Sequence, residues 1–137
     1  MTETLRIAPA LIDEIIAHSL EETPNECCGI IAATNGCATN VERARNIFAS
    51  PLRYEIHPQD QFRIMSAIDD RGEILAGIYH SHTRSAAIPS QTDINLAENW
   101  PDPLYVICSV VDPSAPVVRA FAIRAGEVNE AVLDVRD

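Results

Sequence analysis

The longest apolar run in the chain, residues 27–33, constrains the fold more than any other feature. It spans seven residues, well short of the roughly 18 needed for a membrane span. A run of this length suits a strand that is buried on both faces. Asn35 and Gly36 follow it, and this dipeptide favours the tight turn of a β-hairpin. Residues 37 to about 47 are therefore predicted to return as a second strand.

Two longer segments have the spacing of amphipathic helices. Residues 9–21 and 58–70 each begin with a proline, which suits the first turn of a helix. The side chains predicted to face the core are Leu11, Ile12, Ile15 and Ile16 in the first helix, and Phe62, Met65 and Ile68 in the second. A third, shorter helix is predicted to start at Ser90 and to run to about residue 99.

Four further short runs predict strands, at residues 74–79, 104–111, 117–123 and 128–135. The length of 137 residues suits a single domain, and no shift of composition marks a linker. We therefore predict one α/β (α+β) domain over residues 1–137. It consists of a single mixed, curved β-sheet of about six strands, flanked by three helices.

The charge balance argues against two classes of partner. The chain carries 20 acidic and 10 basic side chains, and all the basic ones are arginine. A net charge of −10 disfavours binding to nucleic acid and to anionic membranes. The N-terminus shows no basic region followed by an apolar stretch, so we expect a cytoplasmic protein. The four cysteines, Cys27, Cys28, Cys37 and Cys108, are then expected to be reduced.

Two histidines stand at the end of the strand predicted for residues 74–79. His80 and His82 are two positions apart, and strand side chains repeat every two residues, so both imidazoles project from one face. Their nitrogens can converge on one ion. Residues 83–89 are small and polar and predict a loop.

Asp93 lies in the first turn of the third predicted helix, where side chains lean back toward the preceding loop. Two imidazoles and one carboxylate suit Zn²⁺ and leave its fourth position for water, as in catalytic zinc sites. Ser90 and Asp93 by themselves have the pattern of a helix capping box. The conjunction with His80 and His82 is what indicates a site for one Zn²⁺ per chain.

Hydrolysis at such a site also needs a side chain that accepts and donates a proton. Glu26 is the candidate, because it stands directly before the buried strand predicted for residues 27–33. A glutamate in this position is more commonly an exposed loop residue. Nothing in the sequence pattern alone places it near His80.

Two motifs together resemble the JAMM/MPN metalloprotease family. The first, E-C-C-G, begins at Glu26, and the second, H-S-H-x7-S-x-x-D, begins at His80. All five functional positions of the family motif match. The resemblance implies a JAMM/MPN (cytidine-deaminase-like) fold, with His80, His82 and Asp93 as zinc ligands, Glu26 as general base and acid, and Ser90 as a donor to the oxyanion. Many members have proline where this chain has Thr83.

The resemblance also implies a class of substrate. Family members cut the bond after the C-terminal tail of ubiquitin or ubiquitin-like proteins, and the compact length resembles the bacterial stand-alone type. The loop at Thr83 and residues 50–58 are similar to the subset that releases cysteine from a sulfur-carrier–cysteine adduct. The expected partner is therefore a ubiquitin-like sulfur carrier or that adduct. Whether the chain forms a homodimer is left open.

Several alternatives remain at this point. Relatives with this fold also serve as non-catalytic binding modules, and a general zinc peptidase would share the same ligands. An Fe(II) oxygenase uses two histidines and a carboxylate as well, and a cysteine hydrolase would use Cys27 or Cys28. A zinc deaminase is disfavoured, because no P-C-x-x-C follows an H-x-E. Of the remaining histidines, His18 is predicted at the surface or at an edge, and His57 in a loop or helix cap.

Overall fold

The computed structural model describes residues 2–137. Met1, which opens the N-terminus predicted to carry no signal, lies outside the described residues. The elements in chain order are β1 (Thr4–Ile7), α1 (Pro9–Glu21), β2 (Cys28–Thr34), β3 (Cys37–Ala44), α2 (Pro58–Asp70), β4 (Ile74–His82), α3 (Gln91–Leu96), the 3₁₀ turn η1 (Ala97–Asn99), β5 (Leu104–Ser109), β6 (Val117–Arg124) and β7 (Glu127–Val135). The three predicted helices are confirmed, with α1 and α2 at the predicted bounds.

The sheet differs from the prediction in strand number and closure. It has seven strands in the order β1-β3-β2-β4-β5-β6-β7, and it closes into a barrel, so the prediction of about six strands in a single curved sheet was wrong. The additional strand, β1, pairs in parallel with β7 and touches β3 at Arg6 and Cys37. A strand of four residues is too short for its periodicity to stand out, and both partners are distant in the sequence.

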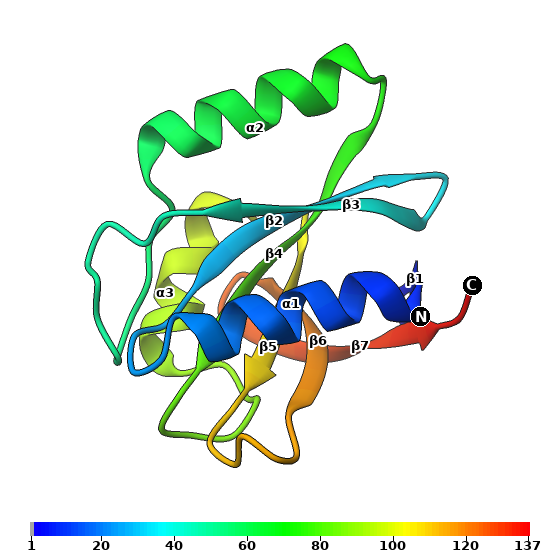
Figure 1. Ribbon diagram of the computed structural model, residues 1–137. Helices are drawn as coiled ribbons and strands as arrows, with labels where there is room; N and C mark the ends of the chain where they lie inside the picture. Colours follow the sequence, from blue (N-terminus) through cyan, green and yellow to red (C-terminus); the bar gives the residue numbers. More distant parts are fainter. Residues whose placement is uncertain (1) are drawn as a thin grey trace.

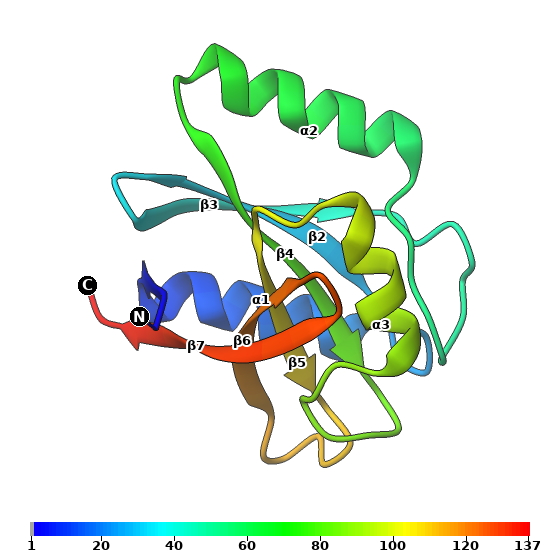
Figure 2. The same ribbon diagram turned by 180° about the vertical axis from the view of Figure 1, so that it is seen from behind.

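Helices cover the sheet from two sides (Figures 1 and 2). Helix α1 packs on one face, where Ile15 joins a core that includes Ile31 and Tyr79. Helix α2 and the segment from α3 to η1 pack on the other face, around Tyr105 and Ile107. Strand β2 is therefore buried on both sides, as its continuous apolar sequence predicts.

The inward face of α2 was predicted correctly at Ile68 but wrongly at Phe62. Phe62 is 76% exposed, whereas Ile64 and Ile68 are buried against the sheet. Because Ile64 and Ile68 are four residues apart, they lie on one face of the helix. Phe62 precedes Ile64 by two positions and points away from it.

Among residues 2–137, none of the helices combines the length and the apolar character that a membrane span requires.

Strand β4 lies at the centre of the sheet and carries the predicted histidine pair. It continues through Ser81 to His82, three residues further than predicted. It runs antiparallel to β2, with His80 opposite Cys28, and parallel to β5, with His82 opposite Ser109. Both histidines therefore belong to a hydrogen-bonded strand, which holds their backbone rigidly.

Gly29 in β2 allows the close packing between the central strands and Tyr79. A Cβ atom at this position would collide with the Tyr79 ring and with the Glu42 carbonyl oxygen. We expect Gly29→Ala to lower the free energy of unfolding by about 3 kcal/mol or more, since overpacking in a rigid core is costly. Gly36→Ala is the matched control: its turn has a φ of +78° but open space, so about 1 kcal/mol is expected. Urea denaturation measures both, and equal losses would contradict the steric argument.

Candidate metal centre

The two histidines of β4 point into the same buried space. Strand alternation puts His80 and His82 on the face covered by α2 and α3, while Ser81 between them faces α1. His80 is 0% and His82 3% exposed. Imidazoles so deeply buried lose their hydration, so they need partners in the protein or a bound ion.

Asp93 reaches the histidines because of how α3 begins. Ser90 is the N-cap residue, and its hydroxyl oxygen accepts a hydrogen bond from the Asp93 amide at 3.1 Å. The Asp93 carboxylate in turn accepts from the Ser90 amide at 3.0 Å, through Oδ2. This capping box, predicted from the sequence, fixes the carboxylate, and the same Oδ2 atom faces the histidines.

Three potential ligand atoms converge on one point. The Nε2 atoms of His80 and His82 are 3.1 Å apart, and Asp93 Oδ2 lies 3.1 Å from the first and 3.0 Å from the second. Ligands at tetrahedral positions about 2.0 Å from Zn²⁺ are about 3.3 Å apart. The arrangement therefore fits a zinc ion with one position left open. It is the one group of His, Cys, Asp or Glu side chains with metal-binding spacing among residues 2–137.

The interactions within this cluster favour an ionised Asp93 carboxylate. Burial raises the pKa of Asp93, but the nearby imidazoles and the Ser90 amide outweigh it, and the pKa lies well below its ordinary value. Burial lowers the pKa of His80, which keeps that ring neutral. Burial also lowers the pKa of His82, but hydrogen bonds to Asp93 and to the Ala86 carbonyl oxygen reverse the shift and raise it. An ionised carboxylate beside imidazoles is the donor set that a divalent cation requires.

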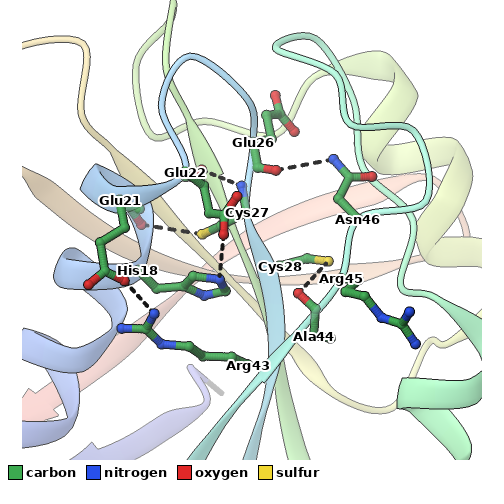
Figure 3. Close-up of polar contacts among 12 residues, drawn as sticks. His18, Glu21, Glu22, Glu26, Cys27, Cys28, Arg43, Ala44, Arg45 and Asn46 are labelled. Atoms are coloured by element: carbon green, nitrogen blue, oxygen red, sulfur yellow. Dashed lines mark hydrogen bonds and ion pairs between the residues drawn. The ribbon is translucent and has the colours of Figure 1, made fainter.

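Glu26 is held at the entrance of β2, next to this cluster. Its backbone amide donates to the Ser50 carbonyl at 2.8 Å, and its carbonyl accepts from Asn46 Nδ2 at 3.1 Å (Figure 3). The side chain is 5% exposed, and its Oε1 atom has no hydrogen-bond partner. A buried carboxyl oxygen without a partner is costly, which points to a functional reason for keeping it there.

Burial also changes the acidity of Glu26. It raises the pKa to about 8, partly offset by His82 and reinforced by the negative charge of Asp93. A carboxyl group with a pKa near neutrality can both accept and donate a proton at physiological pH. A divalent cation at the His–Asp cluster would favour the carboxylate and bring the pKa down again.

Two residues that sequence reasoning missed, Ser81 and Asn46, hold the backbone around Glu26 in place. Ser81 Oγ accepts a hydrogen bond from the Cys27 amide at 2.8 Å, and the Ser81 amide donates to the Cys27 carbonyl at 3.2 Å. Asn46, whose contact with Glu26 is described above, is the other. The position of Ser81 between the two histidines was a usable signal, because strand alternation turns it toward the opposite face.

The loop after β4 is tied to the same region. Thr83, which stands where many JAMM/MPN members have proline, donates its hydroxyl hydrogen to the Pro24 carbonyl at 2.9 Å. His82 Nδ1 lies 2.8 Å from the Ala86 carbonyl oxygen. These contacts join the segment before Glu26 to the loop that leads to α3.

The other two histidines behave differently from each other. His57 caps α2, its Nδ1 accepting from the Gln59 amide at 3.2 Å, as predicted. His18 was predicted at the surface or at an edge, which was wrong: it is 3% exposed, and its Nδ1 lies 2.7 Å from the Tyr79 hydroxyl. Burial lowers its pKa to about 4, so the ring is neutral. It belongs to α1 and bonds to Tyr79 on the opposite face of the sheet, so it is not part of the metal cluster.

The cysteines do not support a thiol nucleophile. All four are free, and Cys27, Cys28 and Cys108 are buried. Burial raises the pKa of Cys27 to about 11 and moves that of Cys28 still higher. Since the thiolate is the reactive form, neither thiol is activated at neutral pH, and the cysteine-hydrolase alternative has no support in the geometry.

Solved structures share this fold. The solution structure of a protein from Desulfitobacterium hafniense covers 97% of this chain and 93% of its own, with a TM-score of 0.88 and 26% identity. The crystal structure of a JAB1/MPN domain protein from Archaeoglobus fulgidus covers 97% of this chain and 100% of its own, with a TM-score of 0.64 and 18% identity. These structures show that the chain has the fold of a JAB1/MPN domain.

The family follows from the sequence comparison. Residues 8–124 match the family described as prokaryotic homologs of the JAB domain, and the chain belongs to it. It is 34% identical to the CysO-cysteine peptidase of Mycobacterium tuberculosis, over 96% of this chain and 90% of that protein. It is 35% identical to the desampylase of Haloferax volcanii, over 77% of this chain and 80% of that protein.

The raised pKa of Glu26 predicts a pH-dependent stability of the metal-free protein. The carboxyl group takes up a proton on folding between its ordinary pKa of 4.5 and its folded pKa of about 8, so stability falls as pH rises through this window. The neutral variant Glu26→Gln lacks this loss. We expect it to be more stable than the wild type above pH 8 and to approach the wild type below about pH 4.5. Urea denaturation in chelator across this range measures the difference, and a constant offset would contradict the assignment.

Proposed function

We propose that the chain is a zinc-dependent peptidase whose metal ligands are His80, His82 and Asp93. The observation that carries this proposal is the convergence of the two Nε2 atoms and Asp93 Oδ2 within 3.1 Å of one another. The donor set of two nitrogens and one oxygen suits zinc and leaves a position free for chemistry. An Fe(II) centre would accept the same ligands, but the buried Glu26 carboxyl beside them favours hydrolysis.

Each residue of the site then has a distinct part in hydrolysis. When bound, Zn²⁺ supplies Lewis acidity, which polarises the scissile carbonyl and makes water acidic enough to attack near neutral pH. Glu26 accepts the proton of the attacking water and passes it to the leaving amine nitrogen. The Ser90 hydroxyl oxygen accepts from the Asp93 amide, so its own hydrogen is free to be donated to the developing oxyanion.

The proposed substrate is a ubiquitin-like sulfur carrier, cut after its C-terminal Gly-Gly tail, with release of cysteine from a carrier–cysteine adduct. Three relatives carry related names: the CysO-cysteine peptidase, the desampylase, and a probable TtuB-protein conjugate cleaving protease of Thermus thermophilus. A buried metal cluster at the end of a strand admits only a slender chain, and glycines allow the closest backbone approach.

The surface beside Glu26 suits such a partner. The loop between β3 and α2 exposes three apolar side chains, Ile47, Phe48 and Leu52, the last being 67% exposed. This loop is bonded to Glu26 through Ser50, so it lies at the entrance to the site. Exposed apolar side chains close together commonly mark a protein-binding surface. We propose that the folded carrier docks there while its tail enters the site.

Metal analysis tests the ligand set. The wild type is expected to hold one zinc per chain, and His82→Ala is expected to lose it, because removing one of three ligands leaves a poorly coordinated ion. His57→Ala serves as the matched control, since His57 only caps α2, and should keep its zinc. Equal zinc content in the wild type and in His82→Ala would contradict the proposed site.

Mass spectrometry of a carrier–cysteine adduct tests the reaction. The wild type should remove one cysteinyl mass, and Glu26→Gln should keep its zinc while losing about 10²–10⁴ in rate, the scale of general acid–base catalysis. Replacing the last carrier glycine by a bulky residue should abolish cleavage by steric clash.

Two outcomes would contradict this proposal. An untouched adduct with efficient cutting of unstructured peptides would indicate a general peptidase. No cleavage of either substrate by zinc-loaded protein would indicate a non-catalytic binding module.

A further inference from the structure

The three proposed ligands differ in how their orientation is fixed. His82 is held by the Ala86 carbonyl oxygen, 2.8 Å from its Nδ1, and Asp93 by the Ser90 amide. His80 has no such contact: its Nδ1 is buried and without a hydrogen-bond partner. Metal-binding histidines normally use this outer nitrogen in a hydrogen bond that sets the ring orientation. Something else must therefore prevent the His80 ring from rotating.

An aromatic ring lies flat against His80. The centroids of the Tyr54 and His80 rings are 4.2 Å apart, and their planes are inclined by only 18°. Tyr54 is 3% exposed, so the ring is enclosed and cannot move aside. A stacked ring at this distance restricts rotation of the imidazole out of its plane, because any tilt would bring the two rings into collision.

Tyr54 is itself anchored next to Glu26. The side-chain amide of Asn46 donates to the Arg53 carbonyl at 3.0 Å and accepts from the Glu55 amide at 3.2 Å, which fixes the backbone on both sides of Tyr54. The same amide donates to the Glu26 carbonyl at 3.1 Å (Figure 3). One side chain therefore sets the position of the stacking ring and of the buried carboxyl group relative to each other.

We propose that Tyr54 is a positioning residue for the metal centre, and that its ring orients His80 in place of the missing hydrogen bond. The inference rests on the proposed metal site and adds a residue to it. It also explains how the His80 ring keeps its orientation although its Nδ1 has no hydrogen-bond partner: the stacked ring fixes it before the ion arrives. Because the role belongs to the flat ring and not to the hydroxyl group, phenylalanine should replace tyrosine and an aliphatic side chain should not.

Chelator competition with zinc separates this role from ordinary packing. Tyr54→Leu is expected to bind zinc about 10-fold or more weakly, the usual effect of losing an outer partner of a ligand, while Tyr54→Phe should bind within about 2-fold of the wild type. The matched control is Tyr105→Leu. Tyr105 is a buried tyrosine of the same core, 2% exposed, whose hydroxyl bonds to the Trp100 carbonyl. The Tyr105→Leu variant should be less stable than the wild type but bind zinc with the same affinity.

Imidazole NMR signals of the metal-free protein give a second readout. In the wild type and in Tyr54→Phe, the His80 ring protons should be shifted upfield by the stacked ring, and in Tyr54→Leu they should move downfield. If Tyr54→Leu does not fold, Tyr54→Met fills the same space without a ring and replaces it in both measurements. Wild-type zinc affinity in a folded aliphatic variant would overturn this inference alone. A wild type that binds no zinc would overturn the proposed metal site, and the inference with it.

Discussion

The pairing of β2 with β4 is the interaction on which the rest of the site depends. It sets Cys28 opposite His80, and Ser81 reinforces it by bonding to both the amide and the carbonyl group of Cys27. Glu26 directly precedes Cys27, so the register of the two strands determines where its carboxyl group lies. A shift of one residue would turn both histidines to the α1 face and move Glu26 away from them.

The site contains buried polar atoms without hydrogen-bond partners, which a purely structural core would avoid. Glu26 Oε1 and His80 Nδ1 are the two buried side-chain atoms without a partner among residues 2–137. Each lowers the stability of the metal-free fold. The surrounding sheet compensates by burying apolar strands on both faces, with Ile30 on one side and Ile31 on the other. Functional sites typically contain a few unfavourable groups of this kind within an otherwise well-packed fold.

How much the sequence could predict depended on the range of each interaction. Period-two spacing and a helix cap act locally, so the histidine pair and the start of α3 could be predicted from residues alone. Glu26 could be assigned only by family resemblance, because its place is set by pairing across more than 50 residues, such as Cys27 with Ser81. The same limit hid β1 and the burial of His18. Tyr54 lies in an irregular loop whose course is set by Asn46, and no periodic signal marks it.

The closure of the barrel has a consequence for the ends of the described chain. The Arg136 amide donates to the Ile7 carbonyl at 3.0 Å, and the Arg6 guanidinium donates to the Asp137 carbonyl at 2.8 Å. The two ends thus lie together (Figure 1), beside Cys37 and at the opposite end of β2 from Glu26. A circular permutant that joins these ends and opens the chain at the exposed Asn35 turn would retain every strand neighbour. In such a permutant the covalent order of the strands would change while the geometry of the proposed metal site stayed the same.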